Sequence, residues 1–185
     1  MEKVKEVPYG VADFVTVMEQ NLYYVDKTMF IPELEKQPRN LFFIRPRRFG
    51  KSIFLSMLHS YYDCNQSAKF QSLFGKLWIG QHPTESQGKY QVLFLDFSQV
   101  SGNIDSLERN FDFYCSVKLD GFMRRYGESY SEETREKVRK AEYAMDKLAF
   151  IHDEAEQKGF SLYLIVDEYD NFTNVVLNEH GEKVY

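Results

Sequence analysis

The residues of this chain best suited to chemistry are Gly50, Lys51 and Ser52, which stand between an apolar segment and an amphipathic one. Within NLFFIRPRRFGKSIFLSML, residues 40–58, this order is typical of a loop that binds phosphate. Backbone N–H groups at the start of a helix face the phosphate oxygens, and the helix dipole favours their negative charge. We expect Lys51 to reach the terminal phosphates and Ser52 to be a ligand of Mg²⁺. The alternative is a plain helix start with Ser52 exposed.

The motif lacks its first glycine, because the usual pattern G-x-x-x-x-G-K-[ST] requires glycine at position 45 and this chain has Arg45. Arginine forms bidentate hydrogen bonds with phosphate oxygens, so we expect one of the loop arginines, Arg48 first, to contact nucleotide. The alternative is that Pro46 stiffens the loop and an arginine pairs with an acid. The predicted nucleotide-binding residues are Arg47, Arg48, Phe49, Gly50, Lys51, Ser52 and Ile53. Within this set we expect Phe49 to pack in the loop rather than to stack on a base.

A second chemical signal is a pair of acids, Asp167 and Glu168, that follows the apolar run LYLIV at residues 162–166. Such a run is typical of a buried parallel strand, and ligands of open α/β sheets bind at the carboxyl ends of the strands. We expect Asp167 to hold Mg²⁺, as a Walker-B aspartate does, and Glu168 to polarise the attacking water. The alternative is a strand that ends in solvated acids. Catalytic roles are thus predicted for Glu168 and Lys51, and metal-binding roles for Ser52 and Asp167.

Three segments together resemble the predicted AAA-ATPase-like family of bacterial proteins. They are RPRRFGKS at residues 45–52, YVDKT at residues 24–28 and VDEYD at residues 166–170. The family normally lacks the first glycine of the loop, so Arg45 is no departure from it. The resemblance implies a P-loop ATPase core of the additional-strand catalytic-glutamate type, which uses ATP and Mg²⁺. Members often carry a C-terminal nuclease-like domain as well, and we find no counterpart of it in this sequence.

The motifs require an alternation of strands and helices to position them. Apolar patterning predicts strands at residues 41–44, 91–97 and 162–166. Capping and termination signals predict helices at residues 13–20, 26–36, 51–62 and 103–126, and one long helix from Ser131 that Gly159 terminates. The fold class predicted is α/β with a mainly parallel sheet: a helical extension, residues 1–38, precedes a nucleotide-binding core, residues 39–185. Asp26 and Thr28 are predicted to cap a helix, and contact of this segment with adenine or an adjoining subunit is the alternative.

The nucleotide-binding core is expected to be incomplete. In the ATPases that this chain resembles, the strand after the Walker-B strand lies between that strand and the P-loop strand. This sequence ends soon after Glu168, so the core is predicted to be truncated there. Lys51 and Asp167 would then lie a strand too far apart, given ~4.8 Å between neighbouring strands. Either the gap closes locally, or another chain fills it, or this fragment does not hydrolyse ATP.

Bulk composition bounds the class of protein. With 185 residues, 43% of them hydrophobic and 16% aromatic, the sequence predicts one globular domain rather than disorder. The net charge of −5 gives no overall basic field for nucleic acid. Cys64 and Cys115 lack the spacing of a zinc site or disulfide framework, and no stretch approaches a membrane span or a signal peptide. A cytoplasmic location is therefore expected.

The sequence predicts binding of Mg-ATP by a P-loop ATPase module, with hydrolysis in the complete protein. Two alternatives stay open at this point: a nucleotide-dependent switch with little turnover, and a nucleic-acid-associated module. A homo-oligomer is a further expectation, because unpaired strand edges invite self-association.

Overall fold

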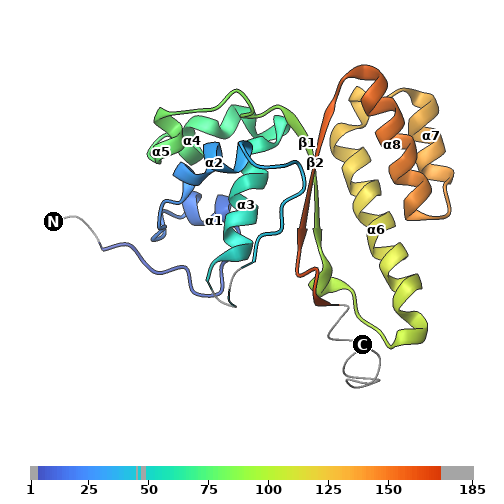
Figure 1. Cartoon of the computed structure of the whole chain (residues 1–185), viewed down its shortest axis with the longest axis horizontal. Helices are drawn as coiled ribbons and strands as arrows, with labels where there is room; N and C mark the ends of the chain where they lie inside the picture. Colours follow the sequence, from blue (N-terminus) through green and yellow to red (C-terminus); the bar gives the residue numbers. More distant parts are fainter. Residues whose placement is uncertain (1–3, 45, 47–48, 172–185) are drawn as a thin grey trace. The chain divides into compact units, whose positions relative to one another are not determined.

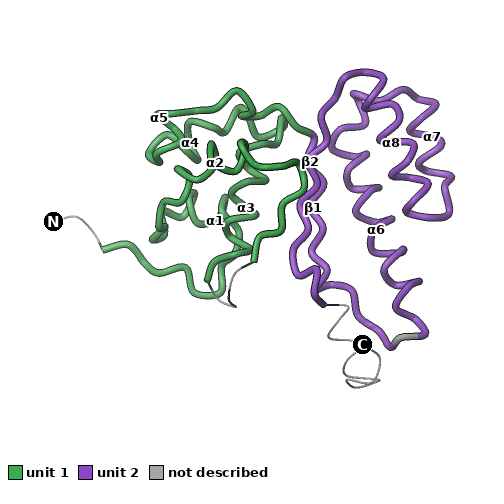
Figure 2. The backbone as a smooth tube through the Cα atoms, in the orientation of Figure 1, with its two compact units in different colours: residues 1–90 green, residues 91–185 purple. Residues whose placement is uncertain are grey.

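The computed structural model describes residues 4–44, 46 and 49–171. They form two compact units, residues 1–90 and residues 91–185 (Figure 2). Each unit has a core of its own.

The first unit is helical (Figure 1). Its elements are α1 Phe14–Glu19, the 3-10 helix η1 Thr28–Phe30, α2 Ile31–Glu35, α3 Lys51–Tyr62, the 3-10 helix η2 Cys64–Lys69, α4 Phe70–Phe74 and α5 Trp78–Gln81. Helix α1 packs against α3 and α4. Phe14, Tyr61 and Phe74 are fully buried in its core, where the rings of Phe14 and Phe74 stack with centroids 4.9 Å apart. This aromatic core holds α3, the helix that begins with the lysine and serine of the glycine-lysine-serine motif.

Asp26 and Thr28 connect the segment before η1 to the start of α5. One carboxylate oxygen of Asp26 accepts hydrogen bonds from the Thr28 N–H and hydroxyl, at 2.8 and 2.7 Å. The other oxygen accepts from the N–H of Trp78 at 2.7 Å, and the Thr28 hydroxyl accepts from the N–H of Ile79 at 3.1 Å. These two residues therefore satisfy the first N–H groups of α5, a helix that sequence reasoning did not connect to them.

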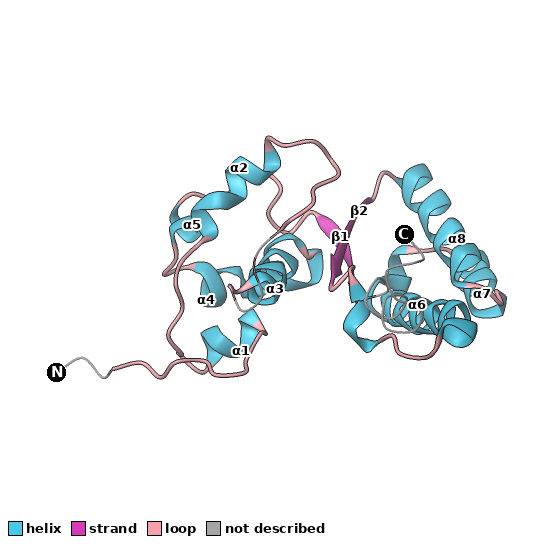
Figure 3. Cartoon of the chain, turned by 60° about the horizontal axis from the view of Figure 1, so that its bottom comes forward, coloured by secondary structure: helices cyan, strands magenta, loops and turns pink. Residues whose placement is uncertain are grey.

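The second unit is a parallel sheet with helices on one side (Figures 1 and 3). Its elements are β1 Tyr90–Asp96, the 3-10 helix η3 Phe97–Gln99, α6 Ile104–Tyr126, the 3-10 helix η4 Gly127–Ser129, α7 Glu132–Lys140, α8 Ala144–Lys158 and β2 Ser161–Asp167. Strands β1 and β2 pair with each other, and α6 and α7 both pack against α8. The predicted α/β class and the strands near residues 91–97 and 162–166 are confirmed.

Side chains of α6 satisfy backbone groups of β1. The hydroxyls of Tyr126 and Tyr114 accept from the N–H groups of Val92 and Asp96, at 3.1 and 2.7 Å. The guanidinium of Arg125 donates to the carbonyl of Val92 at 3.3 Å. Buried backbone polar groups need partners, so these contacts fix β1 against α6.

Two sequence predictions about secondary structure are wrong. Residues 41–44 are not a strand: they form no ladder with β1 or β2, and Phe42 and Ile44 are 82% and 80% exposed. A central parallel strand needs hydrogen-bonded neighbours, and among the described strands this segment has none. The long helix expected from Ser131 to Gly159 is two helices, α7 and α8, with extended backbone at Ala141 and Tyr143 between them.

Candidate functional site

The glycine of the glycine-lysine-serine motif lies directly before α3. Gly50 is its N-cap, with φ 75° and ψ 33° in the left-handed region, which residues with a Cβ atom rarely adopt. A methyl group on the Cα of Gly50 would make only an ordinary van der Waals contact, 3.4 Å, with the Cγ2 of Ile53, so the requirement for glycine comes from the backbone conformation. Glycine is therefore the residue that this turn requires, as the motif predicts.

Lys51 and Ser52 are the first residues of α3, and both are partly exposed. The N–H groups of a first helical turn have no acceptor within the helix, and Gly50 has no side chain to cap them. The first turn also contains no acidic residue. An anion at this helix start would meet N–H donors, the positive end of the helix dipole and the ammonium of Lys51.

The core of the first unit fixes the direction of α3. Phe54, Met57, Leu58 and Tyr61 are buried along its inner face. The ring of Phe43 stacks on that of Phe54, with centroids 5.0 Å apart, and this contact ties the segment before the loop to the helix. The helix start is thus held on a rigid support, which a precise anion site needs.

Of the remaining predicted nucleotide-binding residues, the structure describes Ile53 and Phe49 but not the loop arginines. Ile53 lies in the first turn of α3 and is half-buried, while Phe49 precedes the helix and is 64% exposed. Arg45, Arg47 and Arg48 lie outside the described residues, so their predicted contacts with phosphate stay predictions.

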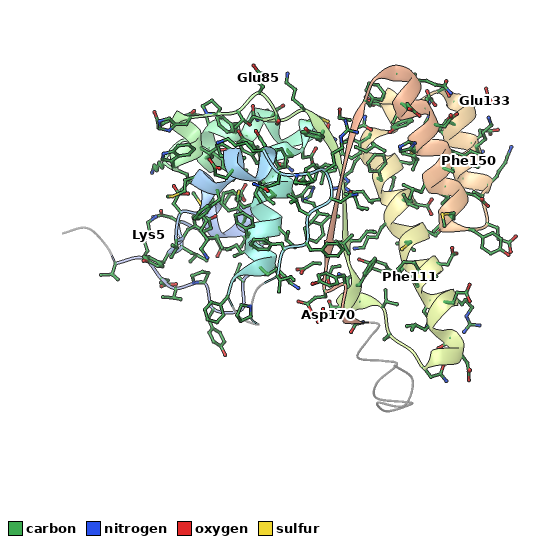
Figure 4. All side chains as sticks on the ribbon, in the orientation of Figure 1. Lys5, Glu85, Phe111, Glu133, Phe150 and Asp170 are labelled. Atoms are coloured by element: carbon green, nitrogen blue, oxygen red, sulfur yellow. The ribbon has the colours of Figure 1, made fainter. Side chains whose placement is uncertain are left out.

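The acidic motif lies at the carboxyl end of β2. Asp167 is the last residue of the strand and is only 3% exposed, and one of its carboxylate oxygens accepts from the N–H of Glu168 at 2.9 Å. Glu168 has a left-handed backbone, with φ 53°. The chain therefore turns sharply directly after the strand. Asp167 has the extended backbone of a strand, whereas Glu168 has the left-handed backbone of the turn. Asp170, labelled in Figure 4, follows as an exposed residue just past the end of the strand.

Asp96, at the carboxyl end of β1, caps the turn that follows it. Its carboxylate oxygens accept from the N–H of Ser98 at 3.0 Å and from the side-chain amide of Gln99 at 3.3 Å. These contacts are those of an N-cap for the 3-10 helix η3.

Asn171 is a positioning residue that sequence reasoning missed. Its side-chain amide donates to the carbonyls of Phe97 and Val100, both at 2.9 Å, and its N–H donates to the carbonyl of Glu168 at 3.1 Å. It thereby joins the turn after β2 to the turn after β1 and holds the segment that contains Glu168. The signal available in the sequence was an asparagine directly after the VDEYD motif.

The structure brings the predicted residues together in two groups, one in each compact unit. Lys51 and Ser52 share the start of α3 in the first unit, and Asp167 and Glu168 share the end of β2 in the second. Joint binding of one Mg²⁺ by Ser52 and Asp167 stays a prediction. The donor set fits the ion, because Mg²⁺ prefers oxygen ligands and takes only one or two from protein beside phosphate and water.

Within the part of the chain that the structure describes, no group of three or more His, Cys, Asp and Glu side chains could hold a metal ion by itself. No helix there is long and apolar enough to cross a membrane.

Comparison with known proteins places the chain in a family. The family described as "Predicted AAA-ATPase" matches residues 8–185. An uncharacterised protein encoded in the vnfD 5′ region of Azotobacter chroococcum mcd 1 is 43% identical over 63 residues, which are 34% of this chain and 12% of that protein. The matched segment thus spans a small part of that relative. No solved structure matches the chain. Because the family match takes in nearly every residue, this chain belongs to the predicted AAA-ATPase family.

Proposed function

We propose that this chain binds ATP together with Mg²⁺ and is the nucleotide-binding part of an ATPase. The observation that carries the proposal is the start of α3: a left-handed Gly50 as N-cap, followed by Lys51 and Ser52 in the first turn. This is the arrangement in which backbone N–H groups and a lysine cradle phosphate. Membership of the predicted AAA-ATPase family supports the same reading.

In the proposed mechanism, the N–H groups of the first turn of α3 and the ammonium of Lys51 bind the phosphate oxygens, with Arg48 as a further cation. Ser52 and Asp167 would hold Mg²⁺, which when bound neutralises charge on the phosphates. Glu168 would orient the attacking water and accept its proton. Positioning and electrostatic stabilisation supply most of the catalysis in phosphoryl transfer, so these few groups suffice if they surround one nucleotide. Hydrolysis is proposed for the complete protein.

The test is isothermal titration calorimetry with ATP, with and without Mg²⁺, on the unaltered chain and on Lys51→Ala. We expect binding that Mg²⁺ strengthens and that Lys51→Ala weakens about tenfold or more, since a charge-assisted hydrogen bond is lost. Lys36→Ala is the matched control, because Lys36 is an exposed lysine of the same unit that pairs with Glu33. Absence of ATP binding by the unaltered chain would contradict the proposal.

Phosphate release, followed in the same samples, tests hydrolysis separately. We expect Glu168→Gln to retain Mg-ATP binding and to lose any release that the unaltered chain shows. Equal loss of binding in Glu168→Gln would assign the residue to the binding site instead of to water activation.

A further inference from the structure

We propose that Lys27 is a second lysine of the phosphate site and binds the phosphate oxygens of the nucleotide beside Gly50 and Lys51. The inference rests on the proposed function and adds a residue to it from a different segment of the chain. A methyl group on the Cα of Gly50 would lie 3.8 Å from the Nζ of Lys27. The ammonium of Lys27 therefore lies against the N-cap of α3, where the proposed phosphate would bind.

The neighbours of Lys27 explain how it is held there. Asp26 and Thr28 each make hydrogen bonds to the start of α5, with Trp78 and Ile79 as partners at 2.7 and 3.1 Å. Thr28 is fully buried. Because the residues on both sides are fixed by these bonds, the backbone of Lys27 is fixed as well. Asp26 and Thr28 thus have structural roles, and the side chain of Lys27 between them extends towards Gly50.

The ammonium of Lys27 makes no hydrogen bond or ion pair with any residue that the structure describes. The three N–H donors of the ammonium therefore stay available to a ligand. Its surroundings make the position less favourable, because the N-terminus of a helix carries partial positive charge. A cation held at the positive end of a helix is stabilised when an anion binds between them.

A polyphosphate is the anion that fits this arrangement. Lysine is a compact charge on a flexible stem and binds phosphate as a point charge, as the lysine of a phosphate-binding loop does. The N–H groups of the first turn of α3 would supply the remaining donors. The residue would thus act on the phosphates and not on the base, which separates this proposal from a contact between this segment and adenine.

The test compares the unaltered chain with Lys27→Met, Lys27→Arg and the control Lys36→Met. Affinities for Mg-ATP and for inorganic tripolyphosphate are measured by calorimetry, and melting temperatures are measured without ligand. We expect Lys27→Met to weaken both ligands about tenfold or more, since each loses a charge-assisted contact. Lys27→Arg restores much of that loss because it restores the charge, and Lys36→Met leaves both affinities unchanged.

The melting temperature distinguishes a phosphate ligand from a structural residue. Removing an unpaired cation beside a helix N-terminus relieves repulsion, so the ligand-free Lys27→Met chain should melt at the same temperature as the unaltered chain or higher. A lower melting temperature together with weaker binding would overturn the inference in favour of a structural role. Weaker ATP binding with unchanged tripolyphosphate binding would overturn it in favour of a contact with the base.

The outcomes also separate this inference from the proposed function. If the unaltered chain binds neither ATP nor tripolyphosphate, the proposed function fails and the inference fails with it. If the unaltered chain binds both and Lys27→Met binds them equally well, the inference alone is overturned. If Lys51→Ala weakens binding of these ligands and Lys27→Met does not, the phosphate site is restricted to the segment that follows Gly50.

Discussion

Gly50 and Glu168 both have a left-handed backbone, with φ 75° and 53°, and each lies in one of the two groups of predicted site residues. At Gly50 the conformation involves no steric strain, since glycine has no Cβ atom. At Glu168 the same conformation is unfavourable by roughly 1–2 kcal/mol for a residue with a side chain. Strained backbone conformations of this kind are frequent at functional sites, although Asn21 has the same φ outside the candidate site. The strain therefore supports the role proposed for the Glu168 carboxylate.

A pair of substitutions at this position separates backbone strain from carboxylate chemistry. Both Glu168→Gly and Glu168→Gln remove the carboxylate, but only glycine relieves the left-handed backbone. We expect Glu168→Gly to be more stable than Glu168→Gln by about 1 kcal/mol in the free energy of unfolding, measured by urea denaturation. Neither variant should release phosphate from ATP. Equal stability of the two variants would contradict strain at this residue.

At the scale of elements, a carboxylate on α8 holds the start of α7. Glu154 is buried and accepts from the N–H and hydroxyl of Ser131, at 2.7 and 2.9 Å, and its side chain pairs with Lys158 at 2.6 Å. Burial acts to raise the pKa of Glu154, but hydrogen bonds from Lys158, Thr134 and Ser131 outweigh it and lower the pKa to about 2. The carboxylate is therefore bound in its charged form, and this contact fixes the angle between the two helices.

The lowered pKa predicts how stability depends on pH. A carboxyl group whose pKa is lower in the folded state stabilises the fold above its unfolded pKa, 4.5, and loses that effect as the pH falls towards about 2. We expect Glu154→Gln to lower the free energy of unfolding by about 1–2 kcal/mol at pH 7. This difference from the unaltered chain should shrink as the pH decreases through that window.

Denaturant unfolding at a series of pH values measures this dependence. Glu133→Gln is the control, because Glu133 lies on α7 and its side chain is 75% exposed in its pair with Lys137. Exposed ion pairs contribute little, so this control should be within about 0.5 kcal/mol of the unaltered chain at every pH. A pH-independent effect of Glu154→Gln would show that the charge of Glu154 is not the stabilising feature.

The elements that the sequence predicts correctly are those with local signals. Helix α6 begins after Asn103, whose side chain accepts from the N–H of Ser106, and the cap is visible in the sequence. The break between α7 and α8 has no such signal: the first N–H of α8, at Ala144, donates to Asp112 on α6 at 2.9 Å. A cap that comes from a distant residue depends on tertiary packing and cannot be found from local spacing.

The same distinction applies to the candidate site. The helix start at Gly50 could be predicted because the glycine-lysine-serine motif and the apolar pattern that follows it are both local signals in the sequence. The contributions of Lys27 and Asn171 could not be, because each depends on contacts between segments far apart in the chain. The strand expected at residues 41–44 fails for a related reason, since an apolar run becomes a strand only where a partner strand provides hydrogen bonds.

At the scale of the whole molecule, whether the two pairs of predicted residues act on one ligand can be measured. The first unit supplies Lys51 and Ser52, and the second supplies Asp167 and Glu168. If the two units bind separate ligands, a substitution in one unit does not change what the other unit contributes to ligand affinity. If they share one Mg-ATP, loss of either group alters what the other contributes to binding. A shared site is therefore recognised by measuring whether the effect of a substitution in one unit on Mg-ATP affinity depends on a substitution in the other unit.

A double-mutant cycle of Lys51→Ala and Asp167→Asn measures this dependence as Mg-ATP affinity. Asparagine retains an oxygen that can accept from the N–H of Glu168, so the turn after β2 is preserved while the metal ligand loses its charge. We expect a coupling energy of about 0.5–3 kcal/mol with Mg²⁺ present, the range for groups that share a partner. Without Mg²⁺ the coupling should fall towards zero, because the ion is the proposed link between the two residues. Additive effects in Mg²⁺ would mean that Asp167 and Lys51 do not act on the same nucleotide, whatever each contributes to its own unit.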